Sequence, residues 1–316
     1  MLLGFDIGGT QIKAACVDPS GSIVQARRVN TPASLEEFRQ AMLALAQELI
    51  APSLQVDAVG IGCKGIINPQ TTRVEVLPGT LHFLEGQLLA EIVAPALPAD
   101  TRIAADNDAR VALAGEIVWG AARRCRHAVM LTLGTGVGGA ILADGRILRG
   151  ATGAAGHIGH LTVDPDGPLC ICGNRGCLET LFSARTIESE AFAAIHRGVA
   201  SRLADCGSNP PSCAEVFDLA QKGDTVAADI VRKAIHVLGA ALAGLALVLD
   251  PEKIILGGQI SEAGDMLLDP LRSEIGWRTR VMLRREIPVV RSILADPSGV
   301  LGAAALALEA VNRAPS

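Results

Sequence analysis

The sequence predicts an α/β protein built from two similar lobes with a central cleft. The first observation is a duplication: a strand, a glycine turn, a strand, a turn containing Asp and Gly, and a third strand occur near residues 2–29 and again near 128–149. The second is composition, because 49% of residues are hydrophobic but only 3% are aromatic, which is typical of buried parallel strands and small-residue helices.

Charge and composition exclude several classes of partner. The net charge is −5 and there is no Tyr, so we expect neither a nucleic-acid partner nor an anionic membrane partner. The N-terminus has no signal-peptide pattern. The most apolar stretch, 234–249, is too short for a comfortable membrane span and contains His236, so we interpret it as a buried helix. We therefore expect a cytoplasmic protein.

The first lobe is expected to span residues 1–117, and the C-terminal helix at 302–316 is expected to pack back on it. Its strands are short apolar runs between turn residues, at 2–7, 11–17, 22–29, 56–63 and 102–105. Its helices are expected at 34–50 and 109–119. Ser34, with Glu37 three residues later, predicts a capping box at the start of the first helix.

The second lobe is expected to span residues 118–301. Its strands are predicted at 128–133, 140–142, 146–149 and 253–256. Helices are expected through much of 184–249. A loop at 157–179 is rich in Gly, Pro, His and Cys, and we treat it below as a metal-binding loop.

The first glycine turn has the pattern Asp6-x-Gly8-Gly9-Thr10-x-x-Lys13. Glycines let backbone N–H groups approach phosphate oxygens, and Thr10 adds a hydroxyl donor. Asp6, at the end of a strand, can hold Mg²⁺ directly or through water. The alternative is a plain hairpin turn that uses glycine for its backbone conformation.

The second glycine turn, Gly134-Thr135-Gly136-Val137-Gly138-Gly139, matches the dinucleotide fingerprint in spacing only. That fingerprint requires a helix directly after the glycines, and residues 140–145 predict a strand and a turn instead. Two glycine hairpins in two lobes fit a nucleoside triphosphate, with Gly257-Gly258 as a third wall for adenosine. The chain has no Gly-x-x-x-x-Gly-Lys-Ser/Thr loop, which excludes a P-loop NTPase.

Four potential metal ligands fall within eighteen residues of one another: His160, Cys170, Cys172 and Cys177. Three sulfurs and one imidazole make a closed tetrahedral zinc site, which indicates a structural ion. The alternative is three loop cysteines without a metal.

The segment 104–110 ends a strand and begins a helix, which is where ligands bind in α/β lobes. Asp106 or Asp108 could be a general base there, and the alternative role for one of them is to cap the helix. Glu179 follows the cysteine cluster and is either functional or a solvated helix residue. His157 alone would be a loop histidine without a special role.

Together these motifs resemble the ROK family (repressors, open reading frames and kinases) of the actin-like ATPase superfamily. The resemblance covers essentially the whole chain and rests on five segments in order: Asp6–Lys13, Asn107–Ala109, Leu133–Gly139, Gly156–His160 and Cys170–Glu179. It implies two actin-like lobes and an ATP-dependent sugar kinase that uses Mg²⁺ and a structural Zn²⁺. The repressor branch carries an extra N-terminal winged helix, for which we expect no room before Asp6.

The resemblance also implies roles for individual residues. Asp108 would be the general base that accepts a proton from a hexose hydroxyl on C6. The sugar would be held by Gly65, Asn107, Asp108, His157, His160 and Glu179. The nucleotide and Mg²⁺ would be held by Asp6, Gly8, Gly9, Thr10, Lys13, Gly134, Thr135, Gly136, Gly257 and Gly258. Zinc would be held by His160, Cys170, Cys172 and Cys177.

The chain departs from the family pattern at two positions. His157 stands where the family usually has Glu, and the resulting His-x-Gly-His form resembles bacterial N-acetylmannosamine kinases. Lys64 stands where the family usually has Pro. We therefore expect an N-acylhexosamine such as N-acetylmannosamine as substrate, with a glucokinase or another hexokinase as the alternative and a sugar-responsive, non-catalytic regulator as the rival. We also expect a homodimer.

Overall fold

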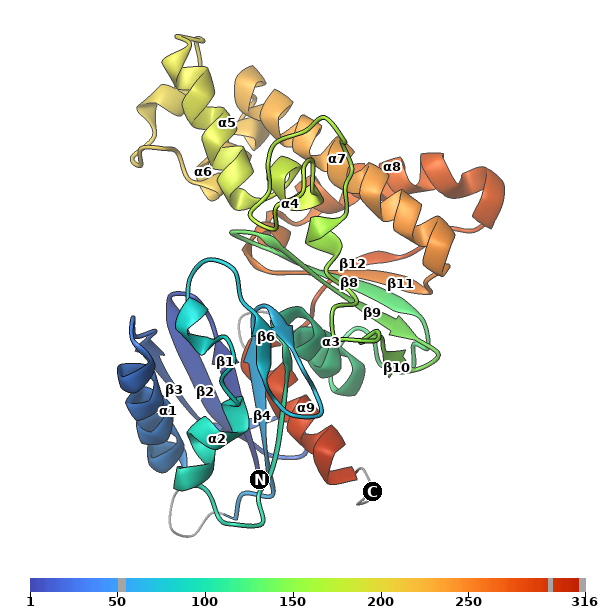
Figure 1. Ribbon diagram of the computed structural model, residues 1–316. Coiled ribbons are helices and arrows are strands. Elements are labelled where there is room, and N and C mark those ends of the chain that lie inside the picture. The colour runs from blue at the N-terminus through green and yellow to red at the C-terminus, as the bar shows by residue number, and fades with distance from the viewer. Residues whose placement is uncertain (51–54, 295–297, 313–316) are drawn as a thin grey trace. The chain divides into compact units, whose positions relative to one another are not determined.

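The computed structural model describes residues 1–50, 55–294 and 298–312, which form two compact units (Figure 1). Unit 1 comprises Met1–Arg124, Ile147–Gly156 and the described residues from Ser292 onward. Unit 2 comprises Cys125–Arg146 and His157–Arg291. Residues 118–124, 147–156, 292–294 and 298–301, which were expected in the second lobe, thus belong to unit 1.

Unit 1 is built on a five-stranded sheet in the order β3-β2-β1-β4-β7. Its strands are β1 (Leu2–Ile7), β2 (Gln11–Val17), β3 (Ile23–Asn30), β4 (Ala58–Cys63) and β7 (Arg102–Asn107). The first three are antiparallel neighbours, whereas β1, β4 and β7 run parallel. A short hairpin of β5 (Ile66–Ile67) and β6 (Val74–Val76) follows β4.

Four helices cover this sheet, two on each face (Figure 1). They are α1 (Leu35–Leu49) and α2 (Leu89–Val93) on one face, and α3 (Asp108–Val118) and α9 (Ser298–Asn312) on the other. The close packing of α9 explains the small-residue composition: a Cβ on Gly60 of β4 would lie 1.8 Å from the carbonyl oxygen of Ala303. Glycine and alanine thus let this helix approach the sheet backbone directly.

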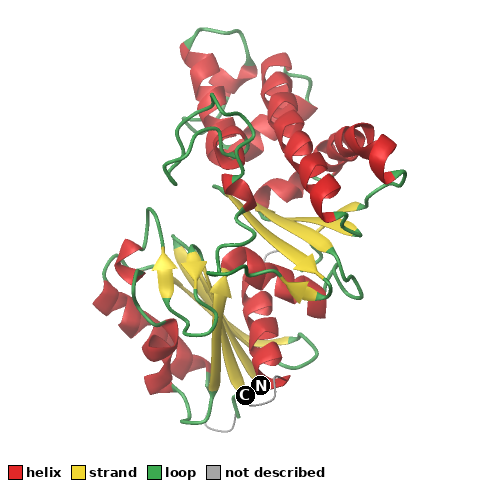
Figure 2. Cartoon of the chain, turned by 45° about the vertical axis from the view of Figure 1, so that its right-hand side comes forward, coloured by secondary structure: helices red, strands yellow, loops and turns green. Residues whose placement is uncertain are grey.

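Unit 2 repeats the same strand order, β10-β9-β8-β11-β12, and confirms the duplication. Figure 2 shows the strands of the two units in yellow. Its strands are β8 (Ala128–Leu133), β9 (Val137–Ala143), β10 (Arg146–Ile147), β11 (Lys253–Gly257) and β12 (Val289–Arg291). As in unit 1, the first strand is antiparallel to the second and parallel to the fourth.

The helices of unit 2 pack with β8, β9 and β11 around one apolar core. They are α4 (Leu178–Leu181), α5 (Ala184–His196), α6 (Cys213–Gln221), α7 (Thr225–Leu249) and α8 (Asp265–Leu283). The stretch 234–249 is the C-terminal part of α7, whose 25 residues are long and apolar enough to cross a membrane. Half of its apolar window is buried, and it packs against α5, α6 and α8, as the core helix of a soluble protein does.

Candidate active site and metal centre

The carboxyl ends of three parallel strands gather candidate carboxylates at one edge of the unit 1 sheet. Parallel pairing places Asp6 of β1 beside Gly62 of β4, and Gly62 beside Asp106 of β7. Asp108 follows β7 as the first residue of α3. Ligands of α/β sheets bind at this edge. Asp6, the predicted Mg²⁺ ligand, and Asp108, the predicted base, therefore both lie at the ligand-binding edge of the sheet.

The buried thiol of Cys63, at the end of β4, lies in the electric field of the charged side chains at this edge. Burial raises the pKa of Cys63 far above its usual range, the negative charge of Asp108 and that of Asp6 raise it further, and the positive charge of Lys64 opposes them. These three charged side chains therefore lie close enough to one buried side chain to act on it through space.

Asp106 has a structural role. It is 1% exposed, and its two carboxylate oxygens accept hydrogen bonds from Arg110 Nε at 2.6 Å and from Arg149 Nε at 2.8 Å. Arg110 in turn donates to two backbone carbonyls of the segment 147–156. Of the two candidate bases, Asp106 is thus committed to a buried ion pair, which favours Asp108 as the base.

Asn107, rather than either aspartate, caps α3. Its Oδ1 accepts hydrogen bonds from the backbone N–H groups of Ala109 and Arg110, at 3.0 and 3.4 Å, and its Nδ2 donates to the carbonyl of Gly65 at 3.0 Å. The Asp108 carboxylate accepts from the N–H of Ala109 at 2.9 Å. The capping prediction for an aspartate was therefore wrong by one position, because the residue between them has the required backbone conformation and a short polar side chain.

The first glycine turn is a tight connection between β1 and β2. The Gly8 N–H donates to the carbonyl of Gln11 at 3.0 Å, and the hydroxyl of Thr31 donates to the carbonyl of Gly8 at 2.8 Å. A Cβ on Gly9 would lie 3.1 Å from Oγ1 of Thr80. The turn is thus braced from two sides, and its glycines leave backbone exposed for a ligand.

Asp6 lies against the start of α9. A Cβ on Gly299 would be 2.1 Å from the Asp6 carboxylate, so position 299 accepts no side chain without displacing that group. Lys13 sits opposite Asp6 on β2 in the antiparallel register. Gly299 was not among the predicted site residues, because it is near the other end of the chain and no motif marks it.

The second glycine turn joins β8 to β9. The Gly134 N–H donates to the carbonyl of Gly136 at 3.0 Å, and β9 begins at the next residue, Val137. A strand rather than a helix therefore follows, which excludes the dinucleotide fingerprint. Gly258, with φ +81°, packs against the turn, since its Cβ would lie 2.4 Å from the carbonyl oxygen of Leu133. The two predicted nucleotide-binding glycine segments of unit 2 are neighbours.

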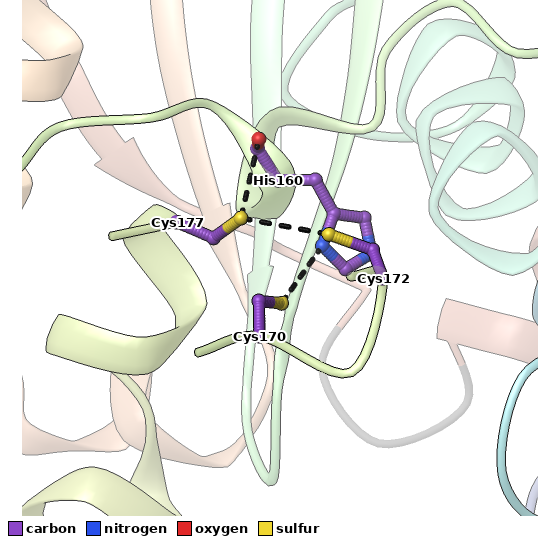
Figure 3. Close-up of side chains that lie close together, drawn as sticks. All are labelled: His160, Cys170, Cys172 and Cys177. Atoms are coloured by element: carbon purple, nitrogen blue, oxygen red, sulfur yellow. Dashed lines mark hydrogen bonds between the residues drawn. The ribbon is translucent and has the colours of Figure 1, made fainter. Parts of the chain in front are cut away.

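The four predicted metal ligands lie together (Figure 3). Their ligand atoms are all within 4.8 Å of one another, with 3.5 Å between Cys170 Sγ and His160 Nδ1 and 3.6 Å between the Cys172 and Cys177 sulfurs. A tetrahedron with Zn–S bonds of about 2.3 Å has S···S edges of about 3.8 Å. The set therefore fits a closed zinc site.

The three cysteines of the cluster differ in their surroundings. Burial raises the pKa of Cys170, and it raises the pKa of Cys177 to about 12, whereas the backbone N–H of Asn174 lowers the pKa of Cys172. His160 presents Nδ1 to the cluster, so its Nε2 remains for another partner, and one imidazole can serve both roles predicted for it.

Glu179 links the metal-binding loop to the second glycine turn. Cys177 is the N-cap of α4, and two residues later the Glu179 carboxylate accepts a hydrogen bond from the Val137 N–H at 2.8 Å. The same carboxylate fills the space beside Gly136, where a Cβ would lie 2.2 Å from it. From the other side, Gly159 packs on the Val137 carbonyl, its Cβ position lying 2.0 Å away.

His157 opens the short 3₁₀ segment Ile158–His160, and its ring stacks on that of His160 with centroids 6.3 Å apart and planes 13° from parallel. It therefore lies beside His160, one of the four potential metal ligands. Within unit 2 the segment Ile158–His160 contacts α4, the helix that carries Glu179. Within unit 1 a hydrogen bond joins Asn107, the neighbour of Asp108, to Gly65.

Comparison with known proteins agrees with this arrangement. A family model described as "ROK family" matches residues 2–310, so the chain belongs to the ROK family. It is similar to a glucokinase from Streptomyces coelicolor (35% identity, 98% of each chain) and to an N-acetylmannosamine kinase from Yersinia pseudotuberculosis (32% identity, 96% of each chain). Among solved structures it resembles a ROK-family glucokinase from Streptomyces griseus in complex with glucose and AMPPNP, with a TM-score of 0.83, 34% identity, and 98% of this chain and 99% of that chain covered.

Proposed function

We propose that this ROK protein is an ATP-dependent sugar kinase that transfers the γ-phosphate of ATP to the C6 hydroxyl of a hexose. The observation that carries the proposal is Asp108, a carboxylate at the ligand-binding edge of the sheet, in electrostatic reach of the same thiol as Asp6. Relatives named as sugar kinases match nearly the whole chain, and one was solved with glucose and an ATP analogue.

In this mechanism Asp108 accepts the proton of the sugar hydroxyl while the hydroxyl oxygen attacks the γ-phosphorus. A positioned base of this kind contributes roughly 10²–10⁴ in rate. The N–H groups of the two glycine turns, Gly8–Thr10 and Gly134–Gly136, hold the phosphates. Gly257 and Gly258 line the nucleotide. Asn107, fixed by its hydrogen bond to Gly65, orients the sugar beside the base.

Two metal ions complete the proposal. Asp6 offers a carboxylate for Mg²⁺, which neutralises charge on the transferring phosphoryl group. Zinc on His160, Cys170, Cys172 and Cys177 has a closed donor set, so its role is to order the loop that ends at Glu179.

His157 supports an N-acylhexosamine, such as N-acetylmannosamine, as the substrate. A neutral imidazole has one donor and one acceptor and can pair with an amide at C2, whereas a carboxylate only accepts and prefers two hydroxyls. Glucose is the second candidate, because glucokinases from several organisms match at 33–36% identity, against 32–33% for N-acetylmannosamine kinases.

A coupled assay of ADP release across a panel of hexoses and N-acylhexosamines tests the proposal. We expect sugar-dependent release, with N-acetylmannosamine among the preferred substrates. A far higher kcat/KM for glucose than for N-acetylmannosamine would replace the substrate assignment by glucokinase. Sugar binding without any ADP release would favour the rival, a sugar-responsive regulator.

We further propose a cytoplasmic homodimer. Support comes from an apolar face on α7 and α8, where Val248 is 80% exposed, Val281 and Met282 are each 74% exposed, and Trp277 is 62% exposed. Contiguous exposed apolar patches commonly mark protein interfaces. Light scattering of the wild type should give the mass of a dimer, and Trp277→Glu should shift it toward the monomer; a monomeric wild type would contradict the proposal.

A further inference from the structure

Lys64 is the first residue after β4, at the sheet edge that carries Asp6 and Asp108. Its ammonium donates a hydrogen bond to the hydroxyl of Thr80. That same hydroxyl is the nearest atom to the Cβ position of Gly9 in the first glycine turn, at 3.1 Å. One hydroxyl group thus stands between the Lys64 ammonium and the turn proposed to hold phosphate.

The loop that carries Lys64 is also fixed toward the proposed base. The carbonyl of its next residue, Gly65, accepts a hydrogen bond from Asn107, the cap of the helix that begins at Asp108. Gly65 itself has φ +90°, and a Cβ there would lie 2.3 Å from the carbonyl of Val76, so this backbone geometry is specific to glycine. The backbone of Gly65, the residue that follows Lys64, is therefore fixed by these contacts.

Charge supports the same placement. Lys64 acts through space on the Cys63 thiol in the direction opposite to Asp6 and Asp108. The Lys64 ammonium thus lies near the carboxylate proposed for Mg²⁺, the carboxylate proposed as base and the first phosphate turn. This is the position that a group stabilising a transferring phosphoryl group must occupy.

Resting on the proposed kinase function, we propose that Lys64 is a catalytic residue whose ammonium moves from Thr80 to a non-bridging oxygen of the γ-phosphoryl group. The new P–O bond forms to the sugar oxygen, and the bond to the bridging oxygen of ADP breaks. The hydroxyl proton goes to Asp108. Lys64 keeps its protons and compensates charge throughout.

Lys64→Met is the test, and Lys64→Arg is the conservative variant. We expect Lys64→Met to lower kcat by roughly 10²-fold while the KM for sugar stays within about threefold, and Lys64→Arg to recover part of the loss. Calorimetry with Mg²⁺–AMPPNP and Mg²⁺–ADP adds a readout that does not need turnover. The preference of the wild type for the nucleotide with a γ-phosphate should fall about tenfold in Lys64→Met.

The surface lysine Lys222, paired with Asp218 on α6, provides the matched control Lys222→Met, which should leave kcat and both affinities unchanged. An unchanged AMPPNP-to-ADP preference in Lys64→Met would overturn the proposal, as would a raised KM for sugar at normal kcat, which would assign Lys64 to the sugar. A wild type without sugar-dependent turnover would instead refute the kinase function. The preference for AMPPNP over ADP would then still decide whether Lys64 contacts the γ-phosphate.

Discussion

Removal of the Glu179 carboxylate should damage both the stability and the nucleotide affinity of the protein. The carboxylate accepts a 2.8 Å hydrogen bond from the Val137 N–H, at the point where the second glycine turn enters β9. A hydrogen bond to a charged acceptor contributes about 1.5–3 kcal/mol. For a unit of this size, that loss lowers the melting temperature by about 3–12 °C. We therefore expect Glu179→Ala to melt in that range below the wild type.

The kinetic consequence distinguishes this residue from one that touches only sugar. Because Val137 directly follows the turn proposed to bind phosphate, Glu179→Ala should raise the KM for ATP by roughly fivefold, a loss of about 1 kcal/mol of uniform binding. The KM for sugar should rise as well.

Thermal unfolding and steady-state kinetics with both substrates measure these effects. Glu179→Gln is the matched control, because its amide oxygen can still accept from Val137 while the charge is gone. It should melt between Glu179→Ala and the wild type, because a hydrogen bond to a neutral acceptor contributes only about 0.5–1.5 kcal/mol. A wild-type melting temperature and an unchanged KM for ATP in Glu179→Ala would refute the link between the metal loop and the glycine turn.

Three further predictions concern other parts of the molecule. Purified protein should contain one zinc per chain, and Cys172→Ser should lose it and raise the KM for sugar, because the metal orders the segment that carries His157. His157→Glu should shift the ratio of kcat/KM for glucose over N-acetylmannosamine by about tenfold toward glucose. Arg110→Met should lower the free energy of unfolding of unit 1 by about 3–5 kcal/mol, because it breaks a buried ion pair with Asp106.

Each of these predictions has a defined failure. Elemental analysis that finds no metal in protein purified without chelator would remove the zinc centre. An unchanged sugar preference in His157→Glu would show that position 157 does not select the C2 substituent. Urea unfolding of Arg110→Met should be compared with that of Arg232→Met, a surface residue paired with exposed Asp229; equal midpoints would contradict the structural role of the Asp106 pair.

The duplicated strands and the glycine turns could be predicted from sequence because their signals are local. A strand needs an apolar run, and a tight turn needs glycine, so both copies were recognisable without any long-range information. The clustering of His160, Cys170, Cys172 and Cys177 was predictable for the same reason, since their spacing lies within one loop. The prediction of a capping box at Ser34 was less accurate. The Ser34 hydroxyl accepts a hydrogen bond from the Glu37 N–H at 3.3 Å, as predicted, but the reciprocal pair of bonds that defines a capping box is found at Ser212 and Glu215.

The contacts that define the environment of the site could not be predicted, because they join distant segments. Asp106 meets Arg149 from a different part of unit 1, and Asp6 meets Gly299 of the last helix. Such pairs depend on how helices pack on the sheet, and packing follows from shape rather than from a local pattern. For the same reason the local pattern alone left Asp106 and Asp108 open as bases, and only the family resemblance favoured Asp108. In the structure, burial and ion pairing separate the two.

The measurement that tests the central claim most directly follows the transfer of labelled phosphate from [γ-³²P]ATP to sugar by the wild type and by Asp108→Asn. The amide keeps the shape of the side chain but cannot take up the proton. We predict labelled sugar phosphate with the wild type, and turnover lower by at least about 10²-fold with Asp108→Asn, while the dissociation constant for sugar stays within about threefold. Near-normal transfer by Asp108→Asn would show that Asp108 is not the general base, and no labelled sugar phosphate with the wild type would show that the protein is not a sugar kinase.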